Sequence, residues 1–168
     1  MNRITLIGME SATPDWETHG VKIVPGNELH PNTPQTPGMT RSAAITHAQT
    51  GARKLWAGTV VVAPNAKTGP HHHGELETLY DVKGRARMRW GNQLEFNGEA
   101  GQGDFIYVPP YVPHQEMNAK EDEPCEAVVV RSGQDPIVVN LEMQDADYET
   151  VAKSESLFIL SCDASARS

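Results

Sequence analysis

Cysteine is scarce in this chain of 168 residues, which contains only Cys125 and Cys162. No Cys-x-x-Cys pair occurs, so structural zinc ribbons and thioredoxin-type redox chemistry are excluded, and a disulfide framework is not expected. Because such cysteine usage suits a reducing compartment, we expect a cytoplasmic protein. The N-terminal stretch MNRITLIGMESATPDW has an apolar run of only about five residues, which is too short for a signal peptide or a membrane span.

Positive charge is also in short supply. The chain has 14 Lys and Arg residues against 22 Asp and Glu residues, which gives a formal net charge of −8. This balance offers no electrostatic footprint for phosphate backbones or anionic lipids, so neither nucleic acid nor a membrane is an expected partner. The expected partner is a small-molecule substrate.

Long hydrophobic runs are absent, and turn residues are frequent, with 14 glycines and 12 prolines. From Leu55 onward, short runs rich in Val, Ile, Tyr and Trp recur at intervals of roughly ten residues, a spacing typical of antiparallel sandwiches and barrels. The alternating run 85–90 leads into Gly91-Asn92 and a second short run, which predicts a hairpin with one cationic and one apolar face. We therefore predict an all-β fold.

The N-terminal part of the chain has a different texture. Its segment 25–39 contains Pro25, Pro31, Pro34 and Pro37, so it can form neither a helix nor a central strand, and we predict a connecting arm. The predicted organisation is an arm with edge strands over residues 1–50, a barrel over 51–141, and a partly disordered C-terminal extension over 142–168.

Three consecutive histidines stand out in the segment TGPHHHGELETLYDVKG. On an extended chain, side chains at even separations share a face, so His71, His73 and Glu77 can converge while His72 points away. Two imidazoles and a carboxylate suit manganese, iron, nickel, cobalt or zinc. His114, about forty residues downstream on another predicted strand, is the natural fourth ligand. An expression tag or a surface tract with adventitious metal affinity are the alternative interpretations.

Two spaced motifs in this region resemble those of the cupin superfamily. His71-x-His73, Glu77 and Gly84 look like the first cupin motif, with Asn65 where its leading glycine usually falls. A second set looks like the second motif, with Tyr111 in place of its inner glycine: Gly103, Pro109, Tyr111, His114 and Asn118. Both departures affect turn positions and leave every ligand in place.

This resemblance implies a small jelly-roll, or double-stranded β-helix, barrel with a Pro-rich N-terminal arm and a short C-terminal extension. It also implies one divalent metal ion, with manganese or iron favoured, bound by His71, His73, Glu77 and His114. Four protein ligands on a six-coordinate metal leave two positions open, which suits a catalytic site and a bidentate oxygen ligand.

We therefore expect a metal-dependent cupin enzyme that acts on a small oxygenated metabolite, such as a phosphorylated keto-sugar, by enolisation, isomerisation or group transfer. Three alternatives remain open at this point. Two are enzymes, because single-domain cupins include a methylthioxylulose-phosphate methylthiotransferase of methylthioadenosine salvage and also dioxygenases. The third is of a different class: a binding module that holds a small ligand without turnover.

Further residues are candidates for roles beside the metal. Glu116 shares the predicted face of His114 and is a candidate catalytic base, with a solvated rim carboxylate as the alternative. Cys125 is a candidate catalytic thiol, with core packing as the alternative. The remaining candidates are tyrosines that line the mouth or pack in the core (Tyr80, Tyr107, Tyr111) and arginines that anchor an anion or lie on the surface (Arg41, Arg87, Arg131).

A homodimer is expected from the arm. The strand-like segment VKIV at 21–24 and the arm that follows it precede the barrel, and a small barrel has open sheet edges that such segments can cover in a second copy.

Overall fold

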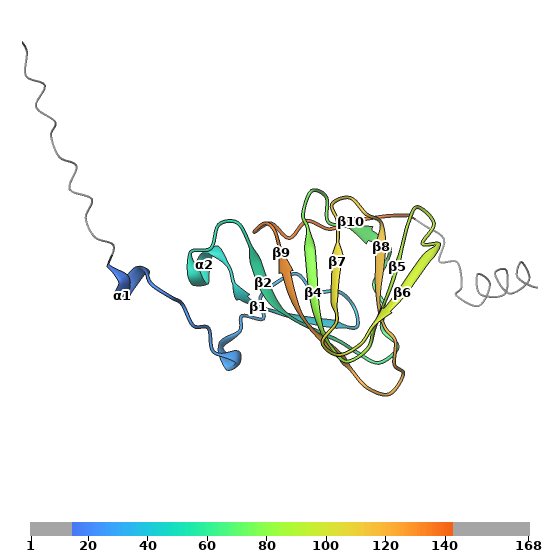
Figure 1. Cartoon of the computed structure of the whole chain (residues 1–168), viewed down its shortest axis with the longest axis horizontal. Helices are drawn as coiled ribbons and strands as arrows, with labels where there is room; N and C mark the ends of the chain where they lie inside the picture. Colours follow the sequence, from blue (N-terminus) through green and yellow to red (C-terminus); the bar gives the residue numbers. More distant parts are fainter. Residues whose placement is uncertain (1–14, 143–168) are drawn as a thin grey trace, which may run out of the picture.

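A computed structural model describes residues 15–142. Within that range, two five-stranded antiparallel sheets face each other, with strand orders β1-β2-β9-β4-β7 and β10-β3-β8-β5-β6 (Figure 1). The elements, in chain order, are α1 (Trp16–His19), η1 (Gly26–Glu28), β1 (Met39–Ile45), α2 (His47–Thr50), β2 (Trp56–Val62), β3 (His71–His72), β4 (Thr78–Lys83), β5 (Ala86–Trp90), β6 (Phe96–Ala100), β7 (Phe105–Val108), β8 (His114–Asn118), β9 (Cys125–Arg131) and β10 (Val139–Asn140).

The all-β, jelly-roll prediction is confirmed by this architecture. The predicted hairpin is present as β5 and β6, which pair in register from Ala86 opposite Ala100 to Trp90 opposite Phe96. On its cationic face, Arg85 and Arg87 both bind the carboxylate of Glu99. Arg89, on the same face, is buried, and its Nε donates to the carbonyl oxygen of Leu94.

The interior of the sandwich has an apolar end and a polar end, and the inward side chains of β9 run from one to the other. The β9 side chains that are buried are Cys125, Ala127, Val129 and Arg131. Strand pairing places Ala127 beside Val60 and Val82, so this end of the sandwich is an apolar core that also contains Met39, Val62 and Cys125. At the other end of β9 lies Arg131, and the polar side chains described below gather there.

Two unusual backbone positions match the departures from the cupin motifs. Asn65 and Tyr111 have φ values of 59° and 60°, in the left-handed region that glycine occupies without steric cost. The chain therefore keeps the turn shapes that glycine normally supports, although other residues stand there.

The described helices are short, and none could cross a lipid bilayer. The segment 25–39 contains the 3-10 turn η1, and isolated bridges pair His30 with Ala43 and Thr36 with Met39. The predicted extension over 142–168 lies, except for Glu142, outside the described residues.

The homodimer remains a prediction, and the arm offers a way to test it. Val21 and Ile23 are 93% and 87% exposed, in the segment between α1 and η1. That segment runs outside the two sheets (Figure 1). Alternate apolar side chains on an extended segment suit pairing with another strand. We expect a dimer mass by light scattering at micromolar concentration, and a shift toward monomer in the double variant Val21→Asp, Ile23→Asp. A monomeric wild-type protein would contradict the prediction.

Candidate metal centre

The histidine run enters the sandwich on β3. His71 and His73 are 3% and 2% exposed, whereas His72 is only half-buried, and its Nδ1 accepts a hydrogen bond from the Gly74 amide. The backbone is extended from 71 to 73, so the predicted alternation holds over these residues. An expression tag or a surface tract would be exposed, and two of these three imidazoles are enclosed.

His114 and Glu116 approach from β8. His114 pairs in register with His71 on one side and with Trp90 on the other. Because side chains alternate between the two faces of β8, Glu116 shares the inner face with His114, as expected from the sequence. Glu116 is 8% exposed and His114 is 1% exposed.

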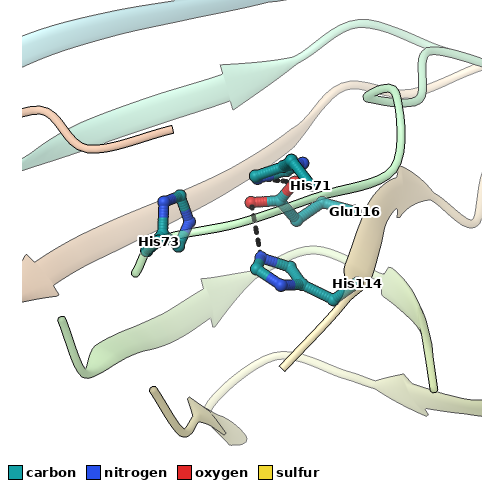
Figure 2. Close-up of side chains that lie close together, drawn as sticks. All are labelled: His71, His73, His114 and Glu116. Atoms are coloured by element: carbon teal, nitrogen blue, oxygen red, sulfur yellow. Dashed lines mark ion pairs between the residues drawn. The ribbon is translucent and has the colours of Figure 1, made fainter. Parts of the chain in front are cut away.

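The structure brings four side chains together: His71, His73, His114 and Glu116. One candidate ligand atom from each lies within 4.8 Å of the others. His71 Nε2 is 3.5 Å from Glu116 Oε2, and His114 Nε2 is 4.0 Å from Glu116 Oε1. Figure 2 shows the Glu116 carboxylate between these two imidazoles, with His73 completing the group.

Backbone carbonyls orient all three imidazoles in the same way. The Nδ1 atoms of His71, His73 and His114 lie 2.8–2.9 Å from the carbonyl oxygens of Gly69, Ile137 and Val112, respectively. A carbonyl only accepts, so each Nδ1 carries the proton, and the Nε2 lone pair is left free to bind a metal.

Two of the free nitrogens make no hydrogen bond within the described residues. These are the buried Nε2 atoms of His73 and His114. Burial and the nearby charge of Arg131 lower the pKa of His73 to about 3, and burial also lowers the pKa of His114, so both imidazoles stay neutral. Buried, neutral and unpartnered imidazoles beside a carboxylate are the donors that a divalent transition metal requires.

Glu116 is held by two hydroxyl groups. Tyr80 Oη donates to Oε1 at 2.5 Å, and Thr68 Oγ1 donates to Oε2 at 2.9 Å. Burial raises the pKa of Glu116, but its electrostatic interactions with the neighbouring imidazole groups and the hydrogen bond from Tyr80 outweigh that effect, so the net pKa lies well below its usual range. The carboxylate is therefore ionised and presented toward the imidazoles.

Glu77 is the predicted ligand that the structure does not bring to this cluster. Its side chain is exposed, and Oε1 accepts a hydrogen bond from Tyr107 at 2.7 Å. Alternation is interrupted at the turn after His73, where Gly74 has a φ of 59°. Beyond that turn, the residues of β4 that face inward are Thr78, Tyr80 and Val82, so Glu77 faces outward. The carboxylate in the cluster is that of Glu116, the residue that the sequence suggests as a catalytic base.

Cys125 is the first residue of β9, at the opposite end of that strand from Arg131. It is 2% exposed in the apolar core, opposite Val62, and six residues before Arg131 on β9. Its packing supports the core interpretation.

We predict that Cys125 reacts slowly with thiol reagents. Burial raises the pKa of its thiol, which disfavours the reactive thiolate, and the side chain is enclosed. In a Cys162→Ser background, DTNB at pH 8 should label Cys125 only after denaturation. Rapid labelling of the folded protein would contradict this burial.

The other candidate residues fall into different environments. Tyr80 is buried against Glu116, whereas Tyr107 and Tyr111 are exposed, Tyr107 beside Glu77 and Tyr111 about 6.0 Å from the His72 ring. Arg87 pairs with Glu99 on the outer face. Arg41 and Arg131 are not surface charges, because they are only 8% and 6% exposed inside the sandwich.

Sequence reasoning missed Thr68 and Thr78. Thr68 Oγ1 accepts from the Glu116 amide as well as donating to its carboxylate. Thr78 is 1% exposed, and its hydroxyl makes no hydrogen bond within residues 15–142. No signal marks Thr68, which lies in a loop. Thr78 could have been found from its even separation from Tyr80 and Val82 in an alternating strand.

One family model matches the part of the chain that contains the cluster. The family model described as "Cupin domain" matches residues 58–131, which run from β2 to the last residue of β9 and include the whole cluster. Residues 58–131 are a cupin domain. A search of curated protein sequences gave no significant match.

Solved structures agree with this cupin assignment. The chain is similar to the polyketide cyclase RemF from Streptomyces resistomycificus, with 25% identity and a TM-score of 0.62 over 79% of this chain and 93% of RemF. It also resembles an uncharacterised double-stranded β-helix protein from Klebsiella pneumoniae, with 20% identity and a TM-score of 0.56 over 73% of this chain and 98% of that one. Oxalate decarboxylase from Bacillus subtilis, described with Mn(II) centres, matches with 22% identity and a TM-score of 0.56 over 68% of this cupin and 30% of the decarboxylase.

Proposed function

We propose that this cupin is a metal-dependent enzyme that acts on an enolisable carbonyl compound with an apolar body. The observation that carries the proposal is the buried cluster of three oriented imidazoles and one carboxylate, with two imidazole nitrogens that make no hydrogen bond within residues 15–142. The residues that would hold the metal are His71, His73, His114 and Glu116. A divalent metal bound there would act as a Lewis acid that stabilises negative charge on a carbonyl oxygen.

A groove supports the apolar character of the substrate. It has a volume of about 640 Å³ and opens between the edge strands β6 and β7. Its lining includes His114, so it leads from solvent to the cluster. The other lining residues are mostly apolar and include Met88, Trp90, Ala100, Ile106, Val108 and Val112.

The groove is large enough for an aromatic or fused-ring body, and its apolar walls do not suit a sugar phosphate. The likeness to RemF supports the same substrate class, because RemF is a polyketide cyclase and polyketides are chains of enolisable carbonyl groups. This favours enolisation over the keto-sugar and thiol-transfer reactions among the expected activities.

The first experiment concerns the metal. Protein purified without a nickel column should retain close to one equivalent of a divalent transition metal by elemental analysis, and manganese or iron is the expected ion. Absence of a stoichiometric metal, both as purified and after incubation with these ions, would refute the proposal.

The second experiment separates an enzyme from a binding module. Exchange of the α-proton in D2O, followed by NMR, should be accelerated for aryl 1,3-diketones such as benzoylacetone. The acceleration should disappear in His114→Ala and persist in Glu77→Gln, whose carboxylate lies outside the cluster. A diketone that raises the melting temperature yet exchanges no faster than in buffer would favour a module that binds without turnover, and oxygen uptake with the diketone would favour a dioxygenase.

A further inference from the structure

The buried charges of the sandwich do not balance. Among residues 15–142, the buried ionic side chains other than histidine are one carboxylate, Glu116, and three arginines, Arg41, Arg89 and Arg131. Arg89 points to the outer side of its sheet, in register with Gln115. Two guanidinium groups therefore share the interior with a single carboxylate, and a divalent cation would add to the excess of positive charge. Buried charge without a counter-charge is costly, so the excess points to an anionic ligand.

Arg131 lies in the row of inward side chains that starts at the groove. In register across the first sheet, Val108 of β7 is followed by Thr78 of β4, Arg131 of β9 and Trp56 of β2. Val108 lines the groove. Adjacent strands are about 4.8 Å apart, so Thr78 and Arg131 are the next side chains along this row, roughly 5 and 10 Å further in.

The guanidinium is held in place by an aromatic ring. Arg131 Cζ lies 5.5 Å from the centroid of the Trp56 ring, in a cation–π contact. The ring in turn fits over Gly58, where an added Cβ would stand 2.7 Å from a Trp56 ring carbon. A glycine at position 58 therefore provides the space that the Trp56 ring occupies.

Arg131 and Thr78 each have one buried polar atom without a hydrogen bond in the described part of the chain. Arg131 Nε and Thr78 Oγ1 are both buried and make no hydrogen bond within the described chain. Arg41 differs, because its Nη1 donates to Thr36 Oγ1 at 2.8 Å. The positive charge of Arg131 also contributes to the low pKa of His73, so its field reaches the metal cluster.

We infer that Arg131 and Thr78 form an oxyanion subsite beside the metal cluster, which takes the carboxylate of an acidic substrate. The inference rests on the proposed function, whose substrate it specifies as an aryl or polyketide-like keto acid. A guanidinium fork matches the two oxygens of a carboxylate, and the Thr78 hydroxyl supplies a further donor. The apolar body would remain in the groove, and the negative charge would balance the interior.

Binding of benzoylformate and of its methyl ester tests the subsite. The two probes share an aromatic ring and an α-dicarbonyl group, but only benzoylformate is charged, and neither has an α-proton. By isothermal titration calorimetry, the wild-type protein should bind benzoylformate at least about tenfold more tightly than the ester. Arg131→Gln should weaken benzoylformate binding about 10- to 100-fold and leave the ester unchanged. Thr78→Val, which preserves shape, should weaken benzoylformate binding by roughly threefold to tenfold.

Arg41→Gln is the matched control, since it removes the same charge from the same interior but from a hydrogen-bonded arginine. Its benzoylformate affinity should stay within about threefold of the wild type, as expected for screened charge at a distance. Arg131→Lys, which keeps the charge, provides a second variant if Arg131→Gln fails to fold by circular dichroism, and it should retain part of the preference for the acid.

Titrations of metal-loaded and EDTA-treated protein separate this inference from the proposed function. If the protein holds no metal but an Arg131-dependent preference for benzoylformate persists, the subsite stands and the metal enzyme does not. Equal affinity of the wild type for acid and ester, or an unchanged preference in Arg131→Gln and Thr78→Val, would overturn the subsite whatever the metal content.

Discussion

Replacing Glu116 by glutamine is expected to abolish stoichiometric metal binding, whereas replacing Glu77 by glutamine leaves it unchanged. Glu116 supplies the buried carboxylate of the cluster, and its oxygens lie 3.5 and 4.0 Å from the free nitrogens of His71 and His114. Glu77 is exposed and bonded to Tyr107. Glutamine keeps the shape but removes the anionic donor, so the affinity for manganese should fall at least about 100-fold in Glu116→Gln.

The measurement is metal content after equilibrium dialysis against manganese, together with calorimetric titration. His73→Ala should lose metal as Glu116→Gln does, because its unpartnered Nε2 is part of the cluster. Circular dichroism shows whether each variant is folded. Loss of metal in Glu77→Gln with full retention in Glu116→Gln would restore the ligand set that the first cupin motif implies, and would require β4 to enter the sandwich one residue out of register.

The contrast between these two glutamates shows how far alternation carries. Side-chain parity is a local property of an extended backbone, and it correctly separates His71 and His73 from His72 and places Glu116 on the face of His114. Parity counted on one side of a turn does not predict which residues face inward on the other side. Gly74 adopts a left-handed φ of 59°, and the chain re-enters the sheet at Thr78 with the inner face on even-numbered residues.

Side-chain alternation on β9 also predicts the buried position of Arg131. On β9 the inward row Cys125, Ala127 and Val129 continues to Arg131, so alternation alone predicts an arginine inside the sandwich. Arginine more often lies on protein surfaces than inside, which is why a surface position is also expected for Arg131 from residue type alone. What alternation does not supply is the pairing of distant strands, and so the cross-strand position of Arg131 beside Thr78 depends on the fold.

Turn positions could be predicted through the resemblance and not through residue type. Tyr111 is a poor candidate for a positive φ by itself, because bulky side chains seldom adopt it. The second cupin motif places a glycine there, and the structure has the corresponding conformation, with the Tyr111 amide donating to the Gly74 carbonyl oxygen at 2.7 Å. This bond joins the loop before His114 to the turn after His73, so the two motifs hold each other in place.

Removing the hydroxyl groups that hold Glu116 is expected to weaken metal binding without removing a ligand. Tyr80→Phe deletes the donor to Oε1, and Thr68→Val deletes both the donor to Oε2 and the acceptor for the Glu116 amide. Partners of this kind orient metal ligands, and their loss typically lowers metal affinity about 10- to 100-fold. Calorimetric titration of manganese should show this for each variant, with a larger loss of stability in Thr68→Val, because the buried amide also loses its partner.

A merely structural role of Tyr80 and Thr68 would lower the melting temperature of the variants and leave the manganese EPR spectrum unaltered. A positioning role should change that spectrum in Tyr80→Phe while leaving the spectrum of the Glu77→Gln control as in the wild type.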